Sequence, residues 1–163
     1  MEIADKYGKA ITMEEGTTNS ISASDLADLH GWNDKDHANS YAIQQPDGYW
    51  RVIAKSPTNN LNFEVLMDRT YAVVAGQTWT ESFYFKSDGN VTFDITFFTK
   101  NGHHFITPTI IDVGNGVKYA YATYTVETGA TYIRALDISN IMWGTSTYID
   151  ILFGQLEQKP YAT

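Results

Sequence analysis

The side chains that could bind metal ions are few and scattered. The chain has 4 His, and two of them, His103 and His104, are adjacent. Neighbouring side chains on a strand point to opposite faces, so these two cannot bind one metal ion unless the chain turns there. No His-x-x-x-His spacing occurs anywhere in the chain. The sequence therefore gives no reason to expect a transition-metal site.

Catalytic motifs are also missing. The chain has no Cys, which excludes a cysteine nucleophile, disulfides and thiolate metal sites. It has no Gly-x-Ser-x-Gly turn and no glycine loop that could hold a phosphate. Two carboxylates such as Glu64 and Asp94 could flank a glycosidic bond, but any acidic chain offers such pairs. We expect no enzyme activity, with a glycoside hydrolase as the less favoured alternative.

The charge balance excludes some partners. The formal net charge is -8, and the 11 Lys and Arg form no cluster, so nucleic acid is not an expected partner. No window holds the roughly 18 apolar residues that a membrane helix needs, so we expect no membrane insertion. The N-terminus lacks the basic and then apolar order of a signal peptide. If Met1 is native, we expect synthesis without secretion.

The elements that must position the remaining polar and aromatic side chains are strands. Aromatic residues make up 14% of the chain, including 11 Tyr, and they favour strands. Asp88-Gly89-Asn90 predicts a hairpin turn between strands over 78–86 and 91–99. In the second of these, alternation predicts an inward face made of Phe93, Ile95 and Phe97. We expect about eight or nine strands with turns every 8–12 residues, the spacing of a sandwich or barrel.

The domain prediction is a single domain over 1–163. Residues 1–25 form a lead-in with one short strand near Ala10–Met13. The composition, 43% hydrophobic and 18% charged, is that of a globular protein.

The stretch Tyr148–Glu157 is the most apolar strand candidate near the chain end. Its partners must be strands made earlier, so we expect it between two long-range neighbours. Ile149, Ile151 and Phe153 share one face by alternation. Leu156 then falls on the opposite face, and a bulge at Gly154 would return it to the core.

Three segments of the chain resemble strands of a known group of proteins. The runs 76–86, 124–134 and 149–157 are similar to strands of jelly-roll carbohydrate-binding modules, and the last of them ends on Gln155-Leu156-Glu157 as those modules commonly do. Such modules are frequent in tail and baseplate proteins of bacteriophages, including modules inserted in distal tail proteins of phages of lactic acid bacteria. The resemblance covers roughly 30–160. One departure is Glu81, at a usually apolar inward position, which predicts either a slipped register or a buried partner.

The resemblance implies an all-β, two-sheet antiparallel jelly roll. It also implies non-catalytic binding of a bacterial cell-surface saccharide, in host recognition or adhesion by a phage tail protein. The chain would then be part of a larger virion tail protein, made in the host cytoplasm, with an extracellular location as the alternative. A structural or oligomerisation domain of a virion protein is the alternative function.

Saccharide binding needs an aromatic ring for stacking and planar polar groups for hydrogen bonds. We predict Trp143 as the stacking ring, because its loop contains Gly144 and Thr145, which cannot cover it well. A core position is the alternative for this tryptophan, and core is the prediction for Trp50 and Trp79. The predicted contacts, each with an ordinary solvated sheet face as the alternative, are Arg134, Asp94, Tyr121, Tyr49 and Arg51.

The resemblance also implies a possible structural calcium ion, since jelly-roll modules often carry one. Asp150 on the last strand is the predicted ligand, together with Asp5 or Glu14 from the N-terminal segment.

Overall fold

The computed structural model describes residues 2–4, 10–12, 32–33, 40–55, 66–67 and 70–159. The regular structure in these ranges is all strand. None of the described residues belongs to a helix long and apolar enough to cross a membrane. The strands are β1 Glu2–Ala4, β2 Ala10–Thr12, β3 Trp32–Asn33, β4 Ser40–Gln44, β5 Trp50–Ala54, β6 Leu66–Met67, β7 Thr70–Ala72, β8 Thr78–Ser87, β9 Thr92–Thr99, β10 Gly102–Ile106, β11 Thr109–Gly114, β12 Val117–Thr125, β13 Tyr132–Met142 and β14 Tyr148–Glu157.

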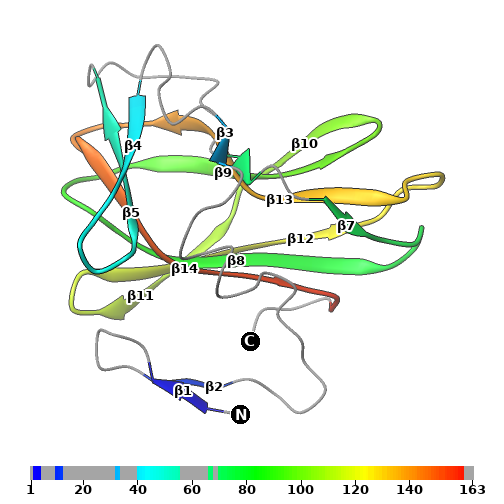
Figure 1. Ribbon diagram of the computed structural model, residues 1–163, viewed down its shortest axis with the longest axis horizontal. Coiled ribbons are helices and arrows are strands. Elements are labelled where there is room, and N and C mark those ends of the chain that lie inside the picture. The colour runs from blue at the N-terminus through cyan, green and yellow to red at the C-terminus, as the bar shows by residue number, and fades with distance from the viewer. Residues whose placement is uncertain are drawn as a thin grey trace.

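Two antiparallel sheets form the body of the fold (Figure 1). One has four strands in the order β10-β9-β13-β7, and the other has six in the order β11-β12-β8-β14-β5-β4. From β7 onward the chain passes repeatedly from one sheet to the other, since β8, β12 and β14 lie in the six-stranded sheet and β9 and β13 in the four-stranded sheet. This is a two-sheet β-sandwich of the jelly-roll kind, as predicted.

The core lies between the two sheets and follows the predicted alternation. Phe93, Ile95 and Phe97 of β9 are all buried, as are Trp50 of β5 and Trp79 of β8. Aromatic rings from the two sheets meet there: Phe83 and Phe85 of β8 lie 5.5 and 5.2 Å from Phe93, centroid to centroid. Packed aromatic pairs of this kind add stability beyond the area that they bury.

The last strand lies between two earlier ones, as its apolar sequence predicts. β14 pairs with β5 on one side and with β8 on the other. Its bulge, however, is not at Gly154: the register with β8 shifts between Ile151 and Phe153, so Leu152 is the extra residue. Leu156 does reach the core, fully buried. Phe153 therefore lies on the outer face, and the prediction of an inward Phe153 is wrong.

Glu81 does face inward, at a position where the resembling modules usually have an apolar residue. β8 and β12 pair in continuous register from Thr78↔Thr125 to Phe85↔Lys118, so no slip occurs at Glu81. Its side chain is fully buried on the same face as Trp79 and Phe83. Of the two alternatives left open by the sequence, the structure excludes the slipped register.

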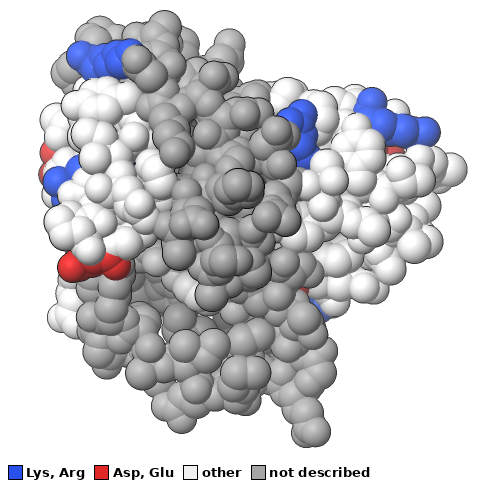
Figure 2. Space-filling model, viewed as in Figure 1, with Lys and Arg blue, Asp and Glu red and all other residues white. Residues whose placement is uncertain are grey.

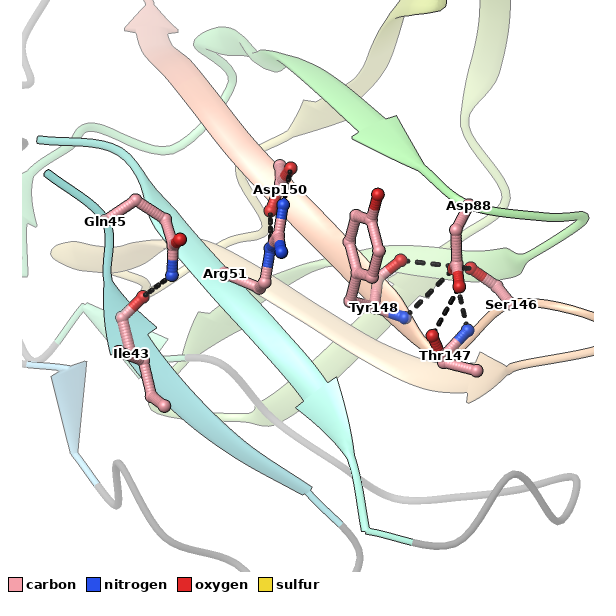
Figure 3. A network of polar contacts seen from close by, with 8 residues as sticks. All are labelled: Ile43, Gln45, Arg51, Asp88, Ser146, Thr147, Tyr148 and Asp150. Carbon is pink, nitrogen blue, oxygen red and sulfur yellow. Dashed lines mark hydrogen bonds and ion pairs between the residues drawn. The ribbon is translucent and has the colours of Figure 1, made fainter. Parts of the chain in front are cut away.

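The segment Asp88-Gly89-Asn90 is not a hairpin turn. It carries the chain from β8 in one sheet to β9 in the other, because β8 and β9 do not pair with each other. The Asp88 carboxylate accepts hydrogen bonds from Ser146 Oγ at 2.8 Å, from Thr147 N at 2.7 Å and from Thr147 Oγ1. Figure 3 shows this carboxylate reaching the loop before β14. The Asp88 side chain therefore ties the crossover from β8 to β9 to the loop before β14. The segment does not close a hairpin.

Other local predictions have mixed outcomes. The short strand expected near Ala10 is confirmed as β2. Glu64, Asp5 and Glu14 lie outside the described residues.

The Asp88 contacts predict a pH-dependent contribution to stability. Partial burial alone would raise the pKa of Asp88, but the hydrogen bonds from Thr147, Ser146 and Tyr148 outweigh it and hold the pKa well below its usual range. A depressed folded-state pKa means that the stabilisation is complete above the unfolded carboxyl pKa, about 3.9, and is lost as the pH falls further. Because Asp88 is exposed and solvent screens its charge, Asp88→Asn should lower the unfolding free energy by only about 1 kcal/mol at neutral pH.

Urea unfolding between neutral pH and pH 3 tests this. The gap between the wild-type protein and Asp88→Asn should narrow below about pH 4. Asp112→Asn is the control: Asp112 is exposed as Asp88 is, but its Oδ1 accepts only a local bond, from Gly114 N of the same strand at 2.9 Å. An equal loss of unfolding free energy in both variants would contradict a stabilising role of the Asp88 carboxylate. A difference between wild type and Asp88→Asn that does not change with pH would contradict it as well.

Candidate functional site

A row of aromatic side chains crosses the outer face of the six-stranded sheet. Tyr119, Tyr84 and Phe153 stand at paired positions on β12, β8 and β14. We call these three residues the aromatic row. The rings of Tyr84 and Tyr119 are 4.6 Å apart, and Tyr121 lies 6.0 Å from Tyr119 on the same strand face. Tyr84, Phe153 and Tyr121 are half-buried, so their rings remain partly open to solvent, whereas Tyr119 is buried.

The bulge at Leu152 places polar side chains beside the aromatic row. It turns Phe153, Gln155 and Glu157 to the outer face, because every residue after an inserted one changes side. Gln155 pairs with Ser82, which pairs in turn with Tyr121. These three residues form a second line beside the aromatic row, in which Gln155 and Ser82 are buried and Tyr121 is partly exposed.

An ion pair lies on the same face, on the other side of the aromatic row. Arg51 of β5 and Asp150 of β14 are at paired positions, with Arg51 Nε donating to Asp150 Oδ1 at 2.8 Å and Nη2 to Oδ2 at 3.0 Å. Figure 3 shows the guanidinium pointing at the carboxylate across the two strands. The Arg51 guanidinium also lies 3.9 Å from the centre of the Tyr148 ring. These contacts hold the Arg51 side chain in one orientation.

The phenols of Tyr119 and Tyr49 stay protonated at neutral pH. Burial raises the pKa of Tyr119 to about 12. Burial also raises the pKa of Tyr49, and the nearby negative charge of Asp150 adds to this while Arg51 opposes it. The hydroxyl groups of these residues can therefore both donate and accept hydrogen bonds.

Three of the predicted site residues come together on this face, and a fourth shares it. Tyr49 and Arg51 lie beside Asp150, close enough for their charges to influence one another. Tyr121 of β12 is on the same face, but it is three strands away from Arg51 of β5 in the order β12-β8-β14-β5. Arg51 and Asp150 were predicted in different roles, and the structure joins them as one ion pair.

The pairing of Asp150 with Arg51 removes the support for Asp150 as a calcium ligand. Both carboxylate oxygens accept hydrogen bonds from the guanidinium. The pair raises the pKa of Arg51, chiefly through the hydrogen bond to Asp150, so the guanidinium keeps its positive charge. A cation at the same carboxylate would be repelled by that charge. Within the described ranges, no group of three or more acidic or histidine side chains could hold a metal ion.

Asp94 and Arg134 lie on the opposite side of the sandwich. Both belong to the four-stranded sheet, on β9 and β13. The Arg134 guanidinium lies 4.0 Å from the centre of the Phe98 ring, and Asp94 Oδ2 accepts a hydrogen bond from Asn140 Nδ2 at 2.9 Å. The prediction that these two residues are neighbours of Tyr121 is wrong, because alternation shows only that a residue faces outward, not on which sheet.

Trp143 is a core residue, and its prediction as an exposed stacking ring is wrong. Its side chain is 1% exposed, within the buried cluster of the sandwich. The loop is pressed onto the β8–β9 connection: Asn90 N donates to Thr145 Oγ1 at 2.9 Å, and a Cβ added to Gly144 would stand 2.3 Å from the Asn90 carbonyl oxygen. Small neighbours in the sequence do not make a ring exposed, because the rest of the sandwich covers it.

Sequence reasoning missed Tyr84, Phe153 and Gln155. Tyr84 follows from alternation along β8, where Phe83 and Phe85 are inward. The other two were hidden by the misplaced bulge. The signal for the correct position is weak, since Leu152 is an ordinary apolar residue with no preference for a bulge.

The ion pair gives a testable prediction. Asp150→Asn should lower the unfolding free energy by about 1–3 kcal/mol, less than a fully buried pair would lose, because the Arg51 side chain is 29% exposed. The double variant Arg51→Met with Asp150→Leu should recover part of that loss, since no unpaired charge remains. A double-mutant cycle by urea unfolding measures the coupling. Calcium should leave the melting temperature unchanged, and a calcium-induced rise that Asp150→Asn abolishes would restore the metal assignment.

The position of Trp143 gives a second prediction. Trp143→Ala should lower the unfolding free energy by about 3–5 kcal/mol, the usual cost of removing a large core side chain. Trp143→Phe should cost less, because much of the buried volume is kept. Thermal melting with both variants measures this. An unchanged melting temperature for Trp143→Ala would show that the ring is not part of the core.

The comparisons with known proteins assign the chain to no family. No protein-family model matches the chain, and no curated protein matches it. One similar solved structure is described as "CBM4 structure and function", with 17% identity and a TM-score of 0.48 over 78% of this chain and 84% of that chain. Another is the enzymatically active domain of tailspike protein 4 of bacteriophage CBA120, with 14% identity and a TM-score of 0.37 over 86% of this chain and 17% of that chain. Similarity at this level does not assign a function to the chain.

Proposed function

We propose that this chain is a non-catalytic saccharide-binding domain whose ligand lies on the outer face of the six-stranded sheet. The observation that carries the proposal is the group of partly exposed rings of Tyr84, Phe153 and Tyr121, bordered by the Arg51–Asp150 pair.

The chemistry of a sugar ring fits this arrangement. Its C–H face is apolar and stacks on aromatic rings, while its hydroxyl groups at the rim need donors and acceptors. Neighbouring strands are about 4.8 Å apart, so the aromatic row on three strands spans about 10 Å. That length accommodates more than one sugar ring, which favours an oligosaccharide or polysaccharide over a monosaccharide.

The carboxylates of this face are poorly suited to hydrolysis. A glycosidase needs one carboxyl group that gives a proton and a second that stays available as base or nucleophile. Here Asp150 is bound by Arg51 through both oxygens, and Glu157 lies 3.3 Å from Lys159 Nζ. Asp94, the other acidic residue considered from the sequence, is on the opposite sheet. These contacts favour binding without cleavage.

The biological setting that we propose is host recognition. The ligand would be a bacterial cell-surface polysaccharide, and the chain would be part of a virion tail protein that adheres to the host. This rests on the resemblance of the strand sequences to modules of phage tail and baseplate proteins. A structural or oligomerisation role is the competing function, and it predicts no binding to cells or glycans.

The aromatic row gives the decisive test. Tyr84→Ala and Tyr121→Ala should each weaken saccharide binding by about fivefold or more, corresponding to roughly 1 kcal/mol for a lost stacking contact. Phe105→Ala is the matched control: this ring is 51% exposed, but it belongs to β10 of the other sheet. Binding is measured on a glycan array and on Gram-positive cells, with reducing-end release as the assay for cleavage.

Each outcome separates the candidate functions. Binding that is lost in the two tyrosine variants and kept in Phe105→Ala supports the proposal. Release of reducing ends would favour a hydrolase instead. Absence of binding to every glycan and cell, or equal loss in all three variants, would sink the proposed face.

A further inference from the structure

The turn between β11 and β12 consists of Asn115 and Gly116. Gly114 pairs with Val117, so only these two residues form the loop. Both have positive φ, 56° for Asn115 and 76° for Gly116. Such a type I′ hairpin turn is the one that an Asn-Gly pair favours. The chain has one other Asn-Gly pair, Asn101-Gly102, at the turn between β9 and β10.

An asparagine followed by glycine can react with its own backbone. At this turn the Gly116 nitrogen would form a bond to Cγ of Asn115, the Cγ–Nδ2 bond would break, and the proton of the Gly116 N–H would leave with Nδ2 as ammonia. The product is a five-membered succinimide. Water then opens the ring at one of its two carbonyl carbons, which leaves an aspartyl or an isoaspartyl residue at position 115. Glycine eases the attack, because no Cβ stands beside its nitrogen.

The surroundings of Asn115 leave this reaction unhindered. Asn115 and Gly116 are both exposed, and a Cβ added to Gly116 would meet no atom within 4 Å. Among the residues that the structure describes, the Asn115 side chain has no hydrogen-bond partner. Water therefore reaches the turn, and no contact holds the amide away from the Gly116 nitrogen.

The attack also requires the turn to open, because the Asn115 backbone must rotate to bring the Gly116 nitrogen onto Cγ. β11 is an edge strand of the six-stranded sheet, and its one neighbour in the described sheet is β12 (Figure 1). Its register with β12 shifts between Asp112 and Gly114, so the ladder is interrupted just before the turn. An exposed strand end with few contacts opens at a low cost in free energy.

Asn101-Gly102 has the same sequence in a different setting. Asn101 Nδ2 donates to Glu127 Oε1 at 3.0 Å, and Asn101 N donates to Thr99 Oγ1 at 3.2 Å. The amide must therefore leave Glu127 before the Gly102 nitrogen can reach it. Asn101 is exposed as Asn115 is, so a difference in rate between the two sites cannot come from access to water.

We propose that Asn115 is a site of spontaneous deamidation in the folded protein and that Asn101 is protected. Each conversion adds one negative charge to a chain whose formal net charge is -8. Charged side chains of both signs are scattered over the described surface in the view of Figure 2. A new exposed carboxylate on such a surface makes the modified protein more acidic, which ion-exchange chromatography detects.

The modification should leave the sandwich folded. The residues of β11 are exposed apart from the half-buried Val113, and none of them belongs to the buried core cluster. An isoaspartyl linkage adds one carbon to the backbone, so a two-residue turn can no longer close in the same register. The change is therefore confined to the edge of the six-stranded sheet.

The test incubates the full chain at mildly alkaline pH, folded in buffer and unfolded in concentrated urea, and follows both sites by peptide mass spectrometry. Each rate in the folded protein is divided by the rate of the same site in urea. This ratio should be about fivefold or more higher for Asn115 than for Asn101, the rate effect of one hydrogen bond that must first be broken. An acidic form should appear in ion-exchange chromatography at the rate measured for Asn115, and it should still melt cooperatively.

Asn115→Gly is the control variant, because glycine keeps the positive φ of the turn and has no amide. It should give no acidic form from this site, and Asn115→Asp marks where the charged product elutes. An Asn115 that stays intact in the folded protein while it reacts in urea overturns the inference. Equal ratios at the two sites overturn the protection of Asn101, and an acidic form that no longer melts cooperatively overturns the confinement of the change to the sheet edge.

Discussion

The insertion of β14 between β5 and β8 is the interaction on which the rest of the structure depends. Without this strand the six-stranded sheet would be two separate pieces, one of β4 and β5 and one of β8, β12 and β11. Ile149, Ile151 and Leu156 contribute fully or largely buried side chains to the core. A strand from the end of the chain thus joins segments formed much earlier, and the loop entropy of these long-range contacts must be offset by burial.

A single inserted residue in that strand decides what each face contains. Before Leu152 the odd-numbered residues of β14 are inward, and after it the even-numbered ones are. The outer face consequently carries Asp150 on one side of the bulge and Phe153 and Gln155 on the other. An acidic residue, an aromatic ring and an amide could not all point outward along an unbroken strand, since their positions differ in parity. The bulge is what gives the proposed face its mixture of groups.

The loop before β14 holds this strand in place and also accounts for Trp143. Asp88, on the connection between the two sheets, accepts bonds from the loop at 146–148, so that the crossover and the start of β14 are fixed together. The same close approach turns Trp143 into the core. The stability of the sandwich and the orientation of the proposed face therefore share one polar contact. A carboxylate with several donors is well suited to this, because hydrogen bonds to a charged acceptor are stronger than those to a neutral one.

The sequence by itself determined the strands and most of their inward faces. Alternation in β9 and β12, and the burial of Trp50 and Trp79, could be predicted because period-2 patterns report directly on a pleated, half-buried strand. The tertiary structure alone decided the position of the bulge, the sheet to which each strand belongs, and hence which outward side chains meet. Tyr121 and Asp94 have the same outward pattern in the sequence, yet they lie on opposite sides of the sandwich. Alternation is a local property of one strand, whereas a binding face is assembled from strands far apart in the chain, and their pairing is set by packing across the whole core.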